Sequence, residues 1–118
     1  MTRPVHVPFL TIEDDDDLLL SFALGENAQT SLTLLRTPKY ERLLDEHERG
    51  VTVGMGEVES GAPELLLALK WSDTLVQIES TARRYVLDVT AVDSAEVKEA
   101  KAILRKMNFD GRVRLENV

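Results

Sequence analysis

Five consecutive carboxylates at positions 13–17 are the first feature of the chain that could do chemistry. A calcium-binding loop alternates its ligands and needs a glycine at its sixth position and a glutamate at its twelfth. Counted from Asp14, these positions hold Leu19 and Gly25, so the calcium signature is absent. Because adjacent carboxylates repel one another, the run is expected in a solvated loop, with an acidic patch that faces a protein partner as the alternative.

The other residue types that catalyse reactions or bind cofactors are few and poorly spaced. The two histidines, His6 and His47, lack the spacing of a zinc-binding helix, and there is no cysteine. His47 is expected to be partly buried or to lie at a helix end. The sequence Gly54-Met55-Gly56 lacks the third glycine of a dinucleotide-binding turn, and no serine lies in a Gly-x-Ser-x-Gly motif. We therefore expect no catalytic, cofactor-binding or metal-binding residue and predict that the chain is not an enzyme.

Trp71 and the pair Arg83-Arg84 are the remaining side chains with binding potential. Trp71 ends an apolar stretch before a tight turn, where a tryptophan either fills the core or anchors a partner. Burial is favoured, because the chain has only six aromatic side chains to fill its core. The two arginines, with Lys70 on a neighbouring strand, could bind an anion, but a solvated strand end is the favoured interpretation.

Length and composition indicate one globular domain over residues 1–118. The chain is 43% hydrophobic and 30% charged, which is ordinary for a globular protein. No apolar run reaches the roughly 18 residues that span a bilayer, and the N-terminus lacks the apolar segment of a signal peptide. With no cysteine, disulfides are excluded and a cytoplasmic location is expected.

The first half of the chain predicts strands around one helix. An edge strand is expected over 5–12, because Pro4 and Pro8 cannot donate to a sheet ladder. The acidic run then forms the loop of a hairpin with a strand over 18–24, and alternating Leu32 and Leu34 predict a strand over 30–36. Thr37 as a cap and Pro38 at the first helical position predict a helix over 38–49, followed by a strand over 51–55.

The second half predicts further strands and a better-defined helix. A turn over 60–63 leads into a stretch over 64–71, for which strand is favoured over helix. Strands are also expected over 74–80, 85–92 and 112–118. Asp93 and Glu96 resemble a capping box, and an apolar stripe follows, so a helix is predicted over 94–108. The last strand-helix-strand segment is expected to place strand 112–118 parallel to strand 85–92. The fold class is therefore α+β, with two helices and about six to eight mostly antiparallel strands.

The excess of negative over positive charge is confined to the first half of the chain. Residues 1–60 contain twelve Asp and Glu against five Lys and Arg, whereas residues 61–118 contain nine of each. The basic footprint of a nucleic-acid-binding or membrane-binding protein is absent. Electrostatics thus favours a basic or metal-carrying partner, and the alternative is that the negative charge only keeps a cytosolic protein soluble.

These observations lead to two hypotheses. The first is a protein-binding domain, in its most concrete form a small bacterial immunity protein that neutralises a toxin enzyme, an analogy of size and charge alone. The alternative is an acidic chaperone or adaptor for a secreted effector, with residues 65–71 as the exposed strand of a homodimer. The candidate partner-binding residues are Asp14, Asp15, Asp16, Asp17, Glu46, Glu48 and Trp71.

Overall fold

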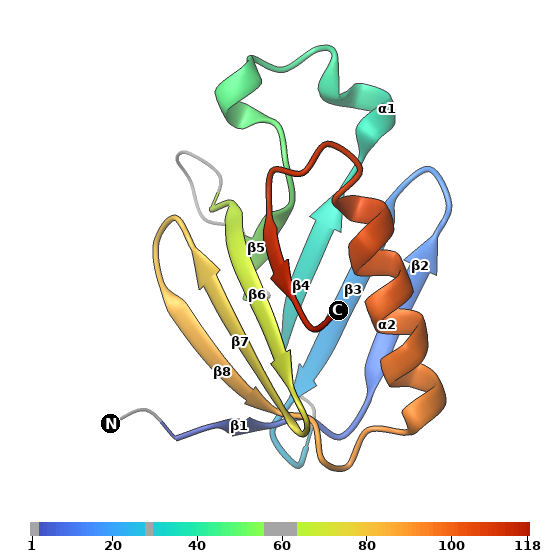
Figure 1. Cartoon of the computed structure of the whole chain (residues 1–118), viewed down its shortest axis with the longest axis vertical. Helices are drawn as coiled ribbons and strands as arrows, with labels where there is room; N and C mark the ends of the chain where they lie inside the picture. The colour runs from blue at the N-terminus through green and yellow to red at the C-terminus, as the bar shows by residue number, and fades with distance from the viewer. Residues whose placement is uncertain (1–2, 28–29, 56–63) are drawn as a thin grey trace.

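The chain folds as an α+β structure with two sheets and a long C-terminal helix (Figure 1). The computed structural model describes residues 3–27, 30–55 and 64–118. The helical segments are α1 (Pro38–Glu41), the 3₁₀ helix η1 (Glu46–Glu48) and α2 (Ser94–Met107). The nine strands of the described residues are β1 (Val5–His6), β2 (Leu10–Asp14), β3 (Leu18–Leu24), β4 (Thr30–Arg36), β5 (Thr52–Gly54), β6 (Leu66–Ser72), β7 (Leu75–Ser80), β8 (Arg84–Asp88) and β9 (Arg114–Glu116).

The strands divide between a five-stranded sheet and a four-stranded sheet. The first has the order β1-β8-β7-β6-β9 and the second the order β2-β3-β4-β5. Among the strand pairs of the described residues, only β1–β8 and β6–β9 are parallel. The acidic run forms the turn of the β2–β3 hairpin, as the sequence predicts, with Asp14 opposite Leu18.

The two sheets meet at two corners. The predicted edge strand over 5–12 is split around Pro8, so that β1 pairs with β8 while β2 pairs with β3. Pro8 has no N–H to donate, which suits a change of sheet at this point. At the other corner, Thr52 of β5 pairs with Leu65 just before β6. Both β1 and β2 lie at sheet edges, as expected.

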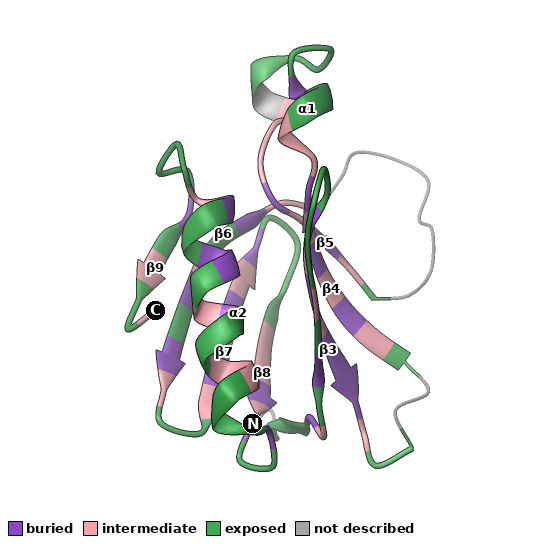
Figure 2. Cartoon of the chain, turned by 90° about the vertical axis from the view of Figure 1, so that its right-hand side faces the viewer, coloured by how far each residue is buried: buried purple, intermediate pink, exposed green. Residues whose placement is uncertain are grey.

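One hydrophobic core lies between the sheets and under α2 (Figure 2). Alternating residues of β4 and β7 point into it, as the sequence pattern predicts. The helix α2 lies along β2 and β3 and buries Ala100, Ile103, Leu104 and Met107 against them. The stretch over 64–71, for which the sequence favours strand over helix, contributes most of strand β6. No helix of the described residues has the length and apolar character needed to cross a membrane.

The start of α2 differs from a capping box in one respect. The Asp93 side chain accepts a hydrogen bond from the Ala95 N–H at 2.9 Å, as expected of an N-cap. The Glu96 carboxylate accepts instead from the Leu10 N–H at 3.2 Å. Glu96 thereby ties the helix to β2 rather than closing the cap.

The first helix is shorter than predicted, and the expected range 38–49 is wrong. It contains only α1 and η1, and Asp45 between them has extended backbone angles. Thr37 makes no capping bond, because its hydroxyl donates to Asp17 Oδ1 at 2.7 Å. The apolar residues of this segment find no surface to cover, and Leu43 is 75% exposed. A short helix without such packing is marginal in water, so it ends after one turn.

The last strand, β9, runs parallel to β8, as the sequence predicts, but the two strands are not neighbours. β9 pairs with β6, and β6 and β7 lie between β9 and β8. The crossover through α2 therefore spans two strands. The predicted turn over 60–63 and Gly56 lie outside the described residues.

Candidate interaction surface

Arg36, at the end of β4, is a buried arginine that the strand alternation turns inward. Leu32 and Leu34 point into the core, and Arg36 is the next residue on the same face. Its side chain is only 1% exposed. A buried guanidinium is costly unless each of its N–H groups finds an acceptor. The surroundings of Arg36 supply those acceptors.

All five N–H groups of Arg36 donate to protein oxygens. Nε and Nη2 donate to the two oxygens of Glu41 at 2.6 and 2.8 Å. Nη1 and Nη2 donate to the two oxygens of Asp110 at 2.9 and 2.8 Å, and Nη1 also donates to the Met107 carbonyl at 2.7 Å. The Phe109 ring centroid lies 4.1 Å from Cζ. This network, here called the Arg36 cluster, uses the full donor capacity of the side chain.

The Arg36 cluster joins the end of β4 to the neighbouring α1 and to the end of α2, more than 70 positions away. It holds α1 through Glu41 and the C-terminal end of α2 through Met107 and Asp110. Burial alone would lower the pKa of Arg36, but the hydrogen bonds to Asp110 and Glu41 outweigh it and raise that pKa above its usual value. The hydrogen bond from Arg36 lowers the pKa of Asp110 well below its usual range, against the opposing effect of burial, and Arg112 adds to this lowering. The cluster therefore remains ionised at neutral pH.

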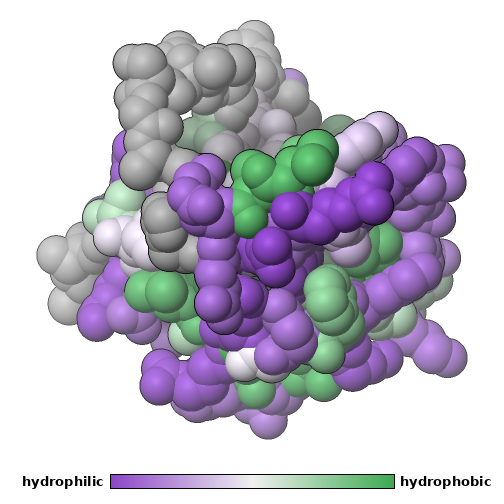
Figure 3. Space-filling view, turned by 90° about the horizontal axis from the view of Figure 1, so that it is seen from above, coloured by the Kyte–Doolittle hydropathy of each residue, from purple (hydrophilic) through white to green (hydrophobic). Residues whose placement is uncertain are grey.

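Large apolar side chains are exposed around the Arg36 cluster. Tyr40, Leu43 and Leu44 extend from α1 and the turn after it, and Phe109 lies at the end of α2; all four are exposed. Figure 3 looks down on this end of the molecule and shows a hydrophobic patch bordered by hydrophilic side chains. Exposed apolar patches with a polar border are typical of interaction sites.

An apolar hollow of about 290 Å³ lies beneath these side chains, between α1, η1 and the adjoining ends of β4 and β5. Its surface is mainly apolar. We call it the apical hollow. Its lining consists of Leu35, Arg36, Thr37, Tyr40, Glu41, Leu43, Leu44, Glu48, Gly50 and Thr52.

The structure places the acidic loop at this same end, where it is held by internal contacts. Asp14 forms an ion pair with Lys106 of α2, and an Asp16 oxygen lies 3.7 Å from Lys39 Nζ. Asp17 accepts from Thr37, as described above. Four aspartates, Asp14 to Asp17, are exposed, as a solvated loop requires.

Glu46 and Glu48 lie on the same end, in η1. The Glu46 side chain is 87% exposed, and one of its oxygens lies 3.8 Å from Arg112 Nη2. Glu48 lines the apical hollow. Across segments 14–17, 36–49 and 106–112, nine carboxylates stand against six basic side chains. We call this end the apical surface, defined by the exposed Tyr40, Leu43, Leu44 and Phe109 and by the carboxylates of Asp14, Asp15, Asp16, Asp17, Asp45, Glu46 and Glu48.

Trp71 is the one candidate residue that does not lie on the apical surface. It is 2% exposed and packs in the core, which confirms the favoured interpretation of burial. Lys101 Nζ lies 5.4 Å from its ring centroid. The alternative role of Trp71 as an exposed anchor is therefore ruled out in the folded chain.

Sequence reasoning missed Arg36, Phe109 and Asp110. The alternation of β4 could have indicated that Arg36 points inward, and a buried arginine requires acceptors. Its partner Asp110 lies 74 positions away, and no local pattern links the two.

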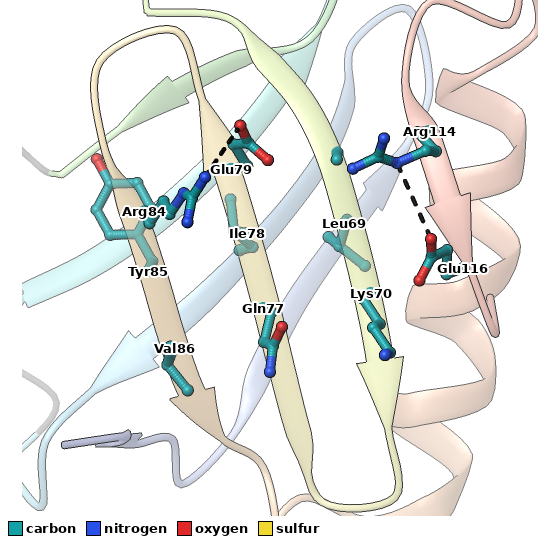
Figure 4. Close-up of a pocket in the computed structure, with 11 residues that line it drawn as sticks. Leu69, Lys70, Gln77, Ile78, Glu79, Arg84, Tyr85, Val86, Arg114 and Glu116 are labelled. Carbon is teal, nitrogen blue, oxygen red and sulfur yellow. Dashed lines mark ion pairs between the residues drawn. The ribbon is translucent and has the colours of Figure 1, made fainter. Parts of the chain in front are cut away.

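A second hollow, of about 390 Å³, lies on the outer face of the five-stranded sheet (Figure 4). Arg84 Nη2 lies 3.8 Å from Glu79 Oε1, and Arg114 Nε lies 3.9 Å from Glu116 Oε1. The two arginines are matched by these carboxylates, and Lys70 leaves the lining with one excess positive charge. Arg83 Nε lies 4.0 Å from Glu64 Oε1, so both arginines of the predicted pair have a carboxylate beside them, and a solvated strand end stays the favoured interpretation.

The strand proposed for dimerisation is not free at its edges. β6 pairs with β7 on one side and with β9 on the other. Its Leu67 is exposed, but most of its apolar residues point into the core.

The described residues contain no group of three or more His, Asp or Glu side chains that could hold a metal ion. The side chain of His47 lies outside the described part of the structure, as does Gly56. No protein-family model matches the chain, and no curated protein or solved structure matches it either.

Proposed function

We propose that this chain is a non-enzymatic protein-binding domain that engages a basic protein through the apical surface. The observation that carries the proposal is the gathering of four large exposed apolar side chains around the Arg36 cluster. Exposing several apolar side chains to water costs free energy, and a partner that covers them removes that cost. The buried cluster beneath holds α1 and the end of α2 in one arrangement, so the surface is ordered before it binds.

The charge of the apical surface supports a basic partner. Carboxylates outnumber basic side chains by nine to six in the segments of this end, and the excess negative charge of the chain lies in residues 1–60, which supply most of it. Such a surface steers a basic protein toward it and raises the association rate. In its most concrete form, the proposal is a cytoplasmic immunity protein that covers the basic substrate cleft of a nuclease toxin.

The first experiment is affinity capture from a lysate of the encoding organism with three immobilised proteins. These are the native chain, the double variant Leu43→Ser/Leu44→Ser and the control Leu67→Ser, whose replaced side chain is exposed on the five-stranded sheet. We expect the native chain and the control to retain a basic protein in stoichiometric amount, and the double variant to lose most of it. Equal retention by all three would rule out the apical surface as the binding site.

The second experiment measures the association rate with the captured protein at low ionic strength. Replacing Asp14, Asp15, Asp16 and Asp17 by asparagine should slow association about tenfold, because steering charges are removed. A matched variant removes the same net charge elsewhere, by glutamine at Glu26, Glu79, Glu99 and Glu116. If both variants slow association equally, net charge alone acts; if neither does, the acidic loop has no part in binding.

A further inference from the structure

We propose that the apical hollow receives one large apolar side chain of the partner, from a segment in which basic residues flank that side chain. This inference rests on the proposed function and specifies the chemistry of the partner at the same surface. It is carried by the size of the hollow, by its lining and by the charges beside it.

The size of the hollow favours a side chain over a free small molecule. Small-molecule sites commonly occupy about 300–1,000 Å³ and enclose most of their ligand. The apical hollow, at about 290 Å³, is at the lower limit of that range and opens between exposed side chains instead of enclosing a ligand. An aromatic or large aliphatic side chain inserted from a partner fits this description, and such anchors dominate binding energy at protein interfaces.

The lining explains why an apolar group is the occupant. Leu35, Leu43 and Leu44 supply aliphatic walls, and Tyr40 supplies a ring. The charged groups Arg36 and Glu41 also line the hollow, but they are bonded to each other through two hydrogen bonds. Each group therefore already has a partner of opposite charge, and an apolar side chain can enter the hollow without breaking these hydrogen bonds.

The charges beside the hollow explain the basic flanks. Glu48 lines the hollow, and the neighbouring Glu46 is almost fully exposed. At the start of the lining segment, Thr37 is bonded to Asp17. The basic side chains Lys39, Arg42, Arg49 and Arg112 lie at the same end, but the carboxylates outnumber them. This excess of negative charge favours lysine or arginine on either side of the inserted side chain. A second copy of this chain would bring the same excess of carboxylates, so self-association at the apical surface is disfavoured.

Synthetic peptides test this inference without the natural partner. The probe is Lys-Lys-Phe-Lys-Lys, compared with one peptide that has alanine in place of phenylalanine and one that has glutamate in place of every lysine. Binding is followed by the NMR shifts of the methyl groups of Leu35, Leu44 and Thr52. We expect saturable shifts with the probe, at least tenfold tighter than with either comparison peptide. The variant Leu44→Ser should lose this binding, whereas Leu67→Ser should retain it.

Each other result would overturn the inference in a distinct way. Equal affinity for the phenylalanine and alanine peptides would show that charge alone is recognised, and the proposed function would stand without the hollow. Equal affinity for the glutamate peptide would remove the basic flanks from the partner. If no peptide shifts these methyl groups at millimolar concentration, the hollow is not an anchor site. The capture experiment with Leu43→Ser/Leu44→Ser then decides the proposed function separately.

Discussion

The helices α1 and α2 differ in what lies beneath their apolar side chains. α2 lies along β2 and β3, and Ile103 and Leu104 are buried there. α1 ends after one turn, and Leu43, just beyond it, projects into solvent. The same kind of side chain therefore stabilises the fold in α2 and is left exposed to solvent beside α1. Among the described residues, the Arg36 cluster links the two regions, because it binds α1 and the end of α2 at once.

The largest expected effect comes from breaking that link. Arg36→Met removes five hydrogen bonds, takes the cation from the buried Glu41 and leaves Asp110 with Arg112 alone. Removing one partner of a buried ion pair costs about 3–5 kcal/mol, so the free energy of unfolding in urea should fall by that amount. The control Arg84→Met breaks a pair whose arginine is mostly exposed, and it should change stability by less than about 1 kcal/mol. Equal losses in the two variants would mean that the cluster does not stabilise the fold.

The contrast between the helices is tested directly by a pair of leucine truncations. Leu104→Ala in α2 opens a cavity in the core and should cost about 2–5 kcal/mol of unfolding free energy. Leu43→Ala beside α1 removes an exposed side chain and should change stability by no more than about 0.5 kcal/mol. Urea unfolding of both variants measures the difference. A large loss with Leu43→Ala would show that this leucine packs in solution and is not available to a partner.

The stability of the contact between the end of α2 and Arg36 should depend on pH, because that contact needs an ionised Asp110. The pKa of Asp110 is lower in the folded chain than in the unfolded chain, so its contribution is fully present above the unfolded value, near pH 4. That contribution is lost as the pH falls from there toward the folded value. The variant Asp110→Asn should therefore be less stable at pH 7 and should lose less stability between pH 5 and pH 2 than the native chain. Parallel acid dependences of native chain and variant would contradict this.

Local sequence patterns predicted the strands and the helix whose residues alternate or repeat along the chain. They missed the features that depend on contacts between segments far apart in the sequence. The alternation of Leu32 and Leu34 places β4 and its inward face, and the stripe after Asp93 places α2. The length of the first helix depends on whether another element covers it, which no local spacing encodes. The choice of β6 as the neighbour of β9, and the contacts of Arg36 with Met107 and Asp110, likewise follow from how distant segments meet. The acidic loop was recognised from the sequence, but the apolar hollow beside it was not.

The smallest expected effect compares the starts of the two helices. Asp93 accepts a hydrogen bond from an N–H of the first turn of α2, whereas Thr37 directs its hydroxyl to Asp17 and leaves the first turn of α1 uncapped. Replacing a capping side chain by alanine costs about 0.5–2 kcal/mol, so Asp93→Ala should lower the unfolding free energy by that amount. Thr37→Ala loses only an exposed hydrogen bond to a solvated loop, and we expect a change below about 0.5 kcal/mol. A loss with Thr37→Ala as large as with Asp93→Ala would mean that the acidic loop anchors α1, and that the loop is part of the fold as well as of the apical surface.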